Sequence, residues 1–137
     1  MGATLVLCKP DAVERGLVGE ILGRFERKGL RIAAARLLRI DADLAARHYA
    51  EHVERPFYPE LRDFIGRSPT LALVLEGPEE TYAIVRTLMG PTNPAAAPPG
   101  TIRGDFGLEV TENLVHGSDS EAAAAREIAL FFGDLDV

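Results

Sequence analysis

The chain has 137 residues, of which 47% are hydrophobic and 26% charged, and these ordinary values exclude a disordered protein. Its net charge of −6 excludes a general nucleic-acid coat, which needs a basic face, so we expect no specific nucleic-acid partner. The single cysteine, Cys8, excludes an internal disulfide and fits a reducing compartment. No apolar run approaches the roughly 18 residues of a membrane span, and no signal peptide is evident, so we expect a cytoplasmic protein with no membrane partner.

The first 40 residues predict a strand, a helix and one ambiguous segment. Residues 3–8 are nearly all apolar, which is typical of a strand buried on both faces. Apolar residues recur at helical spacing from Val18 to Phe25, and Gly29 suits the end of this amphipathic helix. Residues 30–40 alternate like a strand, but their alanines favour a helix, so both structures stay open.

Two helices are predicted next. Asp41 or Asp43 can accept the free N–H groups at the start of a helix that runs to about Val53. The two prolines of RPFYP then break this helix, and a short second helix is predicted over about residues 60–65.

A second buried strand and a third helical region precede a long loop. Residues 70–76 form another apolar run, and residues 79–89 place apolar side chains on one side of a helix. Residues 90–100 contain four prolines and two glycines. A loop so rich in helix-breaking residues is usually exposed and functional when it occurs inside a compact domain.

The C-terminal region predicts a short strand over 114–116 and a final helix. Ser118, followed three residues later by Glu121, is typical of a capping box at the start of that helix. The order of elements predicts one α/β (α+β) domain over residues 1–137, with a βαββαβ core and added helices. The buried face of the final helix is expected to contain Ala124, Ile128 and Phe131.

His116 is the first candidate for chemistry. Gly117 removes a side chain beside the ring, which would let a bulky ligand approach. The start of the following helix offers free N–H groups and a partial positive charge, which favour anions. A neutral imidazole, the main form at neutral pH, can attack phosphorus without a separate base. The alternative is the ordinary one, a histidine that is simply buried or exposed and takes no part in chemistry.

Groups that could hold phosphates are spread along the chain. Lys9 directly follows a buried strand, where a charge is costly unless it has a purpose. The phosphate-binding loop GxxxxGK[ST] is absent, so side-chain cations would have to hold any phosphate. Each further candidate, taken alone, is more often a solvated surface group: Arg86, Thr92, Arg103 and Asn113.

Six motifs resemble those of the nucleoside diphosphate kinase family. Each would be weak alone, but together they cover essentially the whole chain in the family's order and spacing. The resemblance implies ping-pong transfer of the γ-phosphoryl group from a nucleoside triphosphate such as ATP to a nucleoside diphosphate, through a phosphohistidine. The motifs are KPD at 9–11, RPF at 55–57, GPTNP at 90–94, PGTIRGDF at 99–106, NLVHGSD at 113–119 and EI at 127–128.

The resemblance also implies a role for each matching position. His116 would be the phosphorylated histidine, oriented by Glu127 and Ser118. Tyr49 would lie close to the transferred group, and Lys9 would serve in catalysis as well as in binding. The nucleotide contacts would be Lys9 and Asn113 at the ribose hydroxyls, Arg86, Thr92 and Arg103 at the phosphates, and Phe57 with Val110 at the base.

Fold, cofactor and assembly follow from the same resemblance. It implies a ferredoxin-like sandwich with an antiparallel sheet, a homo-oligomer, and Mg²⁺ that arrives on the nucleotide phosphates without a metal ligand from the protein. Physical chemistry agrees, because phosphoryl transfer is catalysed by positioning and by cations around the transferred group. Base selectivity should be low, because stacking on an aromatic ring works for any base.

Two other functions stay open on the residues alone. The segment HYAEH matches HxxEH, an inverted zinc-peptidase motif in which His48 and His52 would bind zinc and Glu51 would act as the base. Five residues match by chance easily, and no third ligand is evident. The second is a non-catalytic nucleotide-binding or scaffold protein of the same fold, against which the intact His116 and Glu127 argue.

Overall fold

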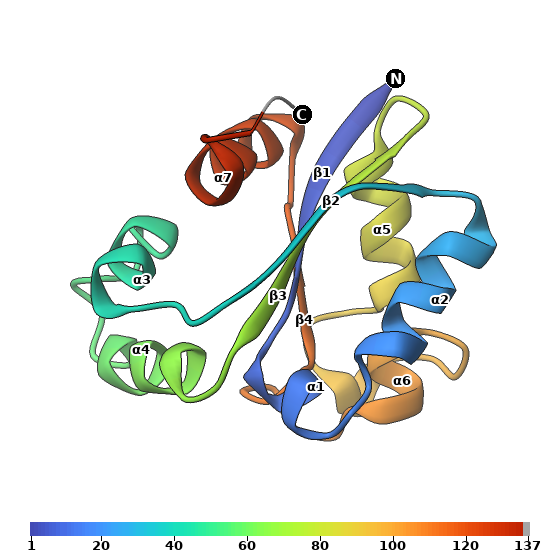
Figure 1. Ribbon diagram of the computed structural model, residues 1–137. Helices are drawn as coiled ribbons and strands as arrows, with labels where there is room; N and C mark the ends of the chain where they lie inside the picture. Colours follow the sequence, from blue (N-terminus) through green and yellow to red (C-terminus); the bar gives the residue numbers. More distant parts are fainter. Residues whose placement is uncertain (136–137) are drawn as a thin grey trace.

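A four-stranded sheet forms the middle layer of the molecule (Figure 1). In the computed structural model, which describes residues 1–135, the strand order is β2-β3-β1-β4 and each neighbouring pair is antiparallel. The two apolar runs predicted as buried strands are the two inner strands, as burial on both faces requires. The strands are β1 (Gly2–Cys8), β2 (Arg31–Leu38), β3 (Thr70–Gly77) and β4 (Val115–Gly117).

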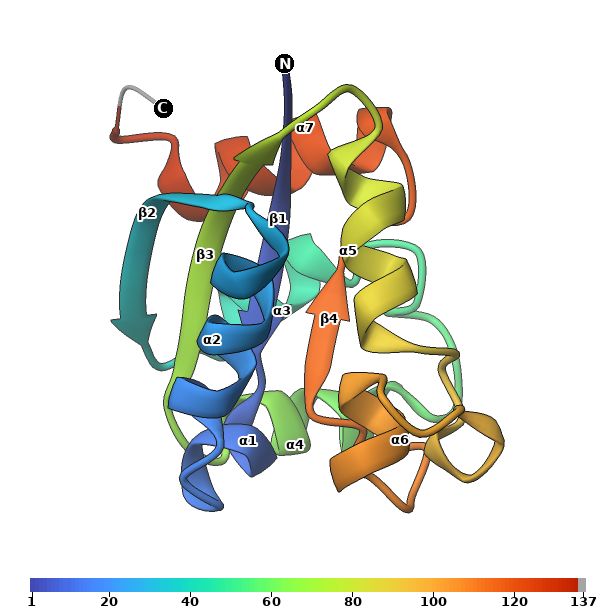
Figure 2. The same ribbon diagram turned by 90° about the vertical axis from the view of Figure 1, so that its right-hand side faces the viewer.

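Helices cover both faces of this sheet (Figures 1 and 2). The core order β1-α2-β2-β3-α5-β4 confirms the predicted ferredoxin-like βαββαβ fold of the α+β class. No helix within the described part of the chain is long and apolar enough to cross a membrane. The helices are α1 (Pro10–Glu14), α2 (Val18–Lys28), α3 (Ala42–His48), α4 (Tyr58–Gly66), α5 (Thr81–Met89), the 3₁₀ turn η1 (Pro94–Ala96), α6 (Ile102–Phe106) and α7 (Glu121–Phe132).

Two hydrophobic cores share the central strand β1. Val6 and Cys8 pack with α2 and α5 on one face, whereas Leu5 and Leu7 pack with Phe131 of α7 and its neighbours on the other. This division follows from the strand itself, because successive side chains point to opposite faces. The second face, which also carries α3 and α4, is the one that matters for the chemistry below (Figure 1).

Several boundaries confirm local predictions. Helix α2 ends at Gly29, whose φ of 103° is in the left-handed region that glycine adopts without strain. The ambiguous segment 30–40 forms β2, because pairing with β3 satisfies its backbone groups and overrides the helical preference of its alanines. Asp41, rather than Asp43, caps α3, and its carboxylate accepts a hydrogen bond of 2.8 Å from the backbone N–H of Leu44.

Other boundaries correct the predictions. Helix α3 ends at His48 rather than near Val53, and the following residues form turns. Ser118 does not cap α7, because its hydroxyl turns inward; Ser120 is the cap and accepts from the N–H of Ala123 at 3.0 Å. The short helices α1 and α6 were not predicted, since each is too short to show a hydrophobic period. Residues 136 and 137 of the predicted domain lie outside the described residues.

The cap assignment predicts a stability difference between two neighbouring aspartates. Asp41→Ala should lower the free energy of unfolding by about 1 kcal/mol, because the N–H of Leu44 loses its acceptor. Asp43→Ala is the matched control, since Asp43 lies in the first turn and makes an exposed ion pair with Arg47, worth about 0.3–0.5 kcal/mol, in place of a capping hydrogen bond. Urea unfolding of both variants measures the difference, and an equal loss in the two would contradict the assignment.

Candidate active site

A cleft of about 750 Å³ brings together ten of the positions singled out as site residues, whereas Ser118 is not among its lining residues. This is an ordinary size for a small-molecule site. Its walls come from the end of β1, the segment between α3 and α4, α5, the loops on either side of α6, β4 and the start of α7. The ten positions are Lys9, Tyr49, Phe57, Arg86, Thr92, Arg103, Val110, Asn113, His116 and Glu127.

The register of β4 decides which way His116 points. Leu7 pairs with His116 and Cys8 with Val115 across the sheet. Val115 belongs to the core under α2 and α5, so His116 faces the opposite side, toward α3 and α7. Gly117 lies buried against α5, where an added Cβ would be 2.7 Å from the sulfur of Met89. The missing side chain of Gly117 therefore makes room for packing against α5. The backbone of Gly117 also lines the cleft beside His116.

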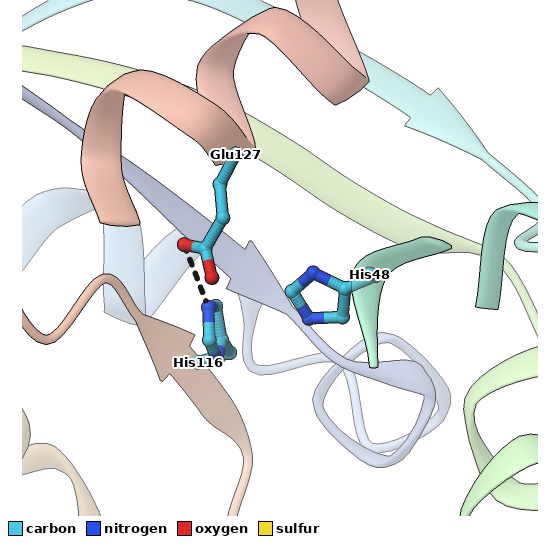
Figure 3. Close-up of side chains that lie close together, drawn as sticks. All are labelled: His48, His116 and Glu127. Carbon is cyan, nitrogen blue, oxygen red and sulfur yellow. Dashed lines mark hydrogen bonds and ion pairs between the residues drawn. The ribbon is translucent and has the colours of Figure 1, made fainter. Parts of the chain in front are cut away.

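Glu127 of α7 holds one edge of the His116 ring (Figure 3). Oε1 of Glu127 lies 3.0 Å from Nε2 of His116 and also accepts a hydrogen bond of 2.6 Å from the hydroxyl of Ser118. Burial alone would raise the pKa of Glu127, but its hydrogen bonds with His116 and Ser118 and its attraction to His116 and His48 lower that pKa to about 2. An ionised carboxylate only accepts, so Nε2 is the donor in this contact, and in the neutral form of the ring Nδ1 carries the free electron pair.

His48, at the end of α3, lies beside this pair (Figure 3). Its ring meets that of His116 edge-on, with the centroids 4.8 Å apart. The side chain is only 4% exposed, and neither ring nitrogen has a hydrogen-bond partner within residues 1–135. Burial, followed by repulsion from His116, lowers the pKa of His48 to about 3, so the ring is neutral. A buried polar atom without a partner costs about 1–3 kcal/mol, which makes His48 an unusual core residue.

The end of α3 contradicts the zinc-peptidase hypothesis. This hypothesis requires His48 and His52 on one face of a helix, but α3 ends at His48 and His52 lies in the turns beyond it. The ring neighbours of His48 instead include His116, which is far away in the sequence. Only tertiary structure reveals this contact, so no signal in the sequence could have pointed to it.

Lys9 enters the cleft directly after β1. Its ammonium group donates to Oδ1 of Asn113, whose amide nitrogen donates in turn to the carbonyl of Thr92 at 3.0 Å. Burial lowers the pKa of Lys9 to about 8, although the attraction of Asp11 opposes the shift. Three residues predicted to bind the nucleotide are thus joined in one chain of hydrogen bonds.

Asp11 is a supporting residue whose role was not predicted from the sequence. Its carboxylate is buried and accepts a hydrogen bond of 3.0 Å from the backbone N–H of Leu114. Leu114 has a φ of 74°, which is rare for a residue with a side chain, and its carbonyl accepts from the N–H of Lys9 at 2.9 Å. Asp11 therefore holds the strained entry to β4, two residues before His116.

Arg103 is more deeply embedded than a plain phosphate contact. It is 5% exposed and donates to the carbonyls of Asn113, Gly90 and Val115 at 3.1, 3.0 and 2.6 Å. Burial and the nearby Arg86 lower its pKa to about 10. Within residues 1–135, three of its five N–H groups bind carbonyls, so Arg103 ties the loops together and also places positive charge in the cleft. Arg86 similarly donates to the carbonyl of Gly117 at 2.9 Å.

The exposed rim of the cleft carries an apolar pair, Phe57 and Val110, beside acidic side chains such as Glu51 and Glu60. Phe57 and Val110 line it and are 50% and 55% exposed. Tyr49 lies deeper, against the ring of His48, and burial raises the pKa of its hydroxyl, so the group stays protonated. The cleft thus combines a rim of mixed apolar and acidic side chains with the buried cations Lys9 and Arg103.

A histidine with one free ring nitrogen, an ionised carboxylate behind it and cations around a nucleotide-sized cleft define a class of protein. On this α+β fold, the class is a phosphotransferase that acts on nucleotides. Comparisons with known proteins agree. The family model described as nucleoside diphosphate kinase matches residues 2–137, and the chain belongs to that family.

Relatives named nucleoside diphosphate kinase match over nearly the whole chain. The protein of Rhodococcus opacus is 64% identical over 130 residues, which are 94% of this chain and 93% of that protein. The protein of Archaeoglobus fulgidus is 56% identical over 137 residues, 100% of this chain and 90% of that one. A solved structure of a halophilic nucleoside diphosphate kinase from Halobacterium salinarum, in complex with CDP, superimposes with a TM-score of 0.93 at 48% identity, and the match covers 98% of this chain and 91% of that one.

The lowered pKa of Glu127 predicts how stability depends on pH. Its carboxylate stabilises the fold above its ordinary pKa of 4.5, and the contribution is lost as the pH falls toward 2. At pH 6, the free energy of unfolding should therefore be higher for the wild type than for Glu127→Gln. At pH 3, this difference between the two proteins should be smaller by about 1–2 kcal/mol. Urea unfolding at the two pH values measures this. Glu121→Gln, at an exposed position of the same helix, is the control and should show no such change.

Proposed function

We propose that His116 carries the phosphoryl group between two nucleotides. In the first half-reaction, the electron pair on Nδ1 attacks the γ-phosphorus of a nucleoside triphosphate. The N–P bond forms while the bond from that phosphorus to the bridging oxygen breaks, and the diphosphate leaves with the electron pair. In the second, a terminal β-phosphate oxygen of another nucleoside diphosphate attacks, the N–P bond breaks, and the neutral ring is restored.

One observation carries this proposal, the hydrogen bond between His116 and Glu127. It keeps the proton on Nε2, so the nucleophilic nitrogen faces away from the carboxylate. Phosphorylation at Nδ1 turns the ring into a cation, and the ionised Glu127 stabilises that charge as it develops. Ser118 fixes the carboxylate in turn, because its hydroxyl donates to the same oxygen.

The cations of the cleft are proposed to hold the phosphates. Charge spreads over the equatorial oxygens of the transferred group, so Arg86 and Arg103 would stabilise it where it develops. Lys9 would serve both the reaction and binding, with Asn113 at the ribose and Thr92 at the phosphates. Tyr49 would lie close to the transferred group. The protonated Lys9 fits this role near neutral pH, since its lowered pKa is still about 8.

Mg²⁺ is proposed to enter with the nucleotide. This ion prefers oxygen ligands and usually keeps several waters, so the phosphates of the substrate suit it. Within residues 1–135, the one group of three possible metal ligands contains two imidazoles, which suit Mg²⁺ poorly. The protein would therefore bind the magnesium–nucleotide complex through its phosphates, without a magnesium site of its own.

We further propose a single catalytic domain over residues 1–137 that works in the cytoplasm as a homo-oligomer. The free, buried thiol of Cys8 suits a reducing compartment. Strand β2 is an edge strand and carries Leu37, a large apolar side chain that is 62% exposed. An exposed edge with an apolar side chain favours contact with a second copy. Light scattering at micromolar concentration should give a mass well above the 14.8 kDa of one chain, and a monomer would overturn this part.

The proposed intermediate predicts a covalent phosphoenzyme. Incubation with Mg-ATP alone should add one phosphoryl group to the intact protein, as measured by mass spectrometry. The label should be lost in acid, as is typical of a phosphoramidate. His116→Ala should remain unlabelled and lose turnover while still binding the nucleotide, because the cationic contacts remain. A stable label on Ser118 or Ser120 would overturn the mechanism.

Low selectivity for the base is also expected. Phe57 and Val110 offer only apolar contact to a base, and stacking is worth roughly 1–3 kcal/mol for any base. Sites that read a base edge through buried polar groups reject the wrong partner by about 10⁴ or more. The kcat/KM values for ADP, GDP, CDP and UDP, measured with one donor, should therefore differ from one another by much less than a factor of about 10⁴. A spread near 10⁴ would reveal a group that reads the base.

A further inference from the structure

We propose that His48, His116 and Glu127 form a binding site for a divalent transition-metal ion, best suited to Zn²⁺, and that the bound ion switches off phosphoryl transfer. The binding of the ion needs no assumption about the reaction. The blocking effect rests on the proposed role of His116 as the nucleophile. The ion is distinct from the Mg²⁺ that accompanies the nucleotide.

The three side chains already converge. One ligand atom from each of His48, His116 and Glu127 can be chosen so that all three lie within 4.8 Å of one another. The rings of His48 and His116 and the carboxylate of Glu127 face a common space in Figure 3. His48 is 4% exposed, and neither of its ring nitrogens has a partner within the described chain. A metal ion would supply the partner that the protein does not.

Ligand chemistry selects the ion. Two imidazoles and one carboxylate form a known zinc ligand set, in which water takes the fourth position. Tetrahedral zinc with bonds of about 2.0–2.1 Å needs ligand atoms roughly 3.4 Å apart. The separation between Nε2 of His116 and Oε1 of Glu127, 3.0 Å, is already close to that value. The site therefore needs a small inward movement of His48, and no rearrangement of the fold.

Charge and access also permit binding. The carboxylate of Glu127 lies against the His116 ring and can provide one negative charge to a divalent cation in a buried position. Arg126 lies 3.7 Å from the other carboxylate oxygen, but its side chain is half exposed and can turn toward solvent. His116, with 27% of its side chain exposed in the cleft, gives the ion a path from solvent.

Binding would block the reaction through the tautomer of His116. The nucleophilic form carries its proton on Nε2 and its free electron pair on Nδ1. A metal on Nε2 needs the electron pair of that nitrogen, so the proton moves to Nδ1 and no proton leaves the ring. Nδ1–H cannot attack phosphorus. Zinc binding and nucleophilic attack therefore require opposite tautomers of one imidazole, so the zinc-bound ring cannot take up a phosphoryl group.

The first experiment measures zinc binding to the nucleotide-free protein by competition with a chromogenic zinc chelator. Wild type should bind one Zn²⁺ per chain. His48→Phe keeps the ring contacts of His48 but removes its nitrogens. Loss of a residue that only hydrogen-bonds to a metal ligand weakens binding 10–100-fold, so loss of a ligand should weaken it by about 100-fold or more. His52→Phe is the matched control and should bind zinc like wild type. Equal zinc affinity in wild type and His48→Phe would overturn the site.

The second experiment uses wild type alone, so it does not depend on the folding of a variant. With only three histidines in the chain, ¹H–¹⁵N NMR of the imidazoles can follow each ring. One equivalent of Zn²⁺ should move the proton of His116 from Nε2 to Nδ1 and shift a nitrogen of His48, while leaving His52 unchanged. Shifts at His48 and His52 without one at His116 would overturn the proposal.

Phosphorylation by Mg-ATP, measured before zinc, after one equivalent of zinc and after a chelator, separates the two proposals. If phosphorylation of the protein stops after zinc is added and returns after the chelator is added, the result supports the proposal that zinc switches off phosphoryl transfer. Labelling that persists in the zinc-loaded protein overturns the block but leaves His116 as the nucleophile. Failure of labelling in zinc-free buffer overturns the proposed function, while the zinc affinities still decide the site.

Discussion

The pairing of β4 with the end of β1 is the constraint on which the site depends. Side chains alternate along a strand, so a shift of one residue would turn His116 toward α5 and turn the side chain of Val115 toward α3 and α7. Two bonds hold the register at its entry, from the N–H of Lys9 to the carbonyl of Leu114 and from the N–H of Leu114 to Asp11. The carboxylate of Asp11 thus contributes to chemistry that it never touches.

The sequence predicted what depends on local pattern. The apolar runs identified β1 and β3, and the helical period with Gly29 identified α2 and its end. The family motifs led to ten positions that the structure brings into one cleft. Neither the apolar runs nor the helical period could reveal contacts between distant segments. The facing of His48 and His116 and the three carbonyls around Arg103 arise only when the sheet assembles.

Burial gives the cleft its electrostatic character. The chain is acidic overall, yet Lys9 and Arg103 are concentrated where water is scarce, and each has its pKa lowered by that burial. Charges in such a setting are not fully satisfied by backbone carbonyls, so an anionic ligand is favoured. Glu127 beside His116 behaves differently, because its hydrogen bonds and its attraction to His116 and His48 together lower the pKa of the carboxyl group by more than burial raises it. The cleft thus separates a region for phosphates from a region for the ring proton.

The distribution of the cleft residues along the chain has a kinetic consequence. Lys9 stands near the start of the chain and Glu127 near its end, and β4 joins the sheet only through its pairing with β1. Contacts this distant in sequence form late, because the loops between them must close first. No helix or hairpin can acquire a working cleft by itself. Recovery of activity after dilution from denaturant would therefore report completion of the last strand pairing, whereas helical circular dichroism would report earlier steps.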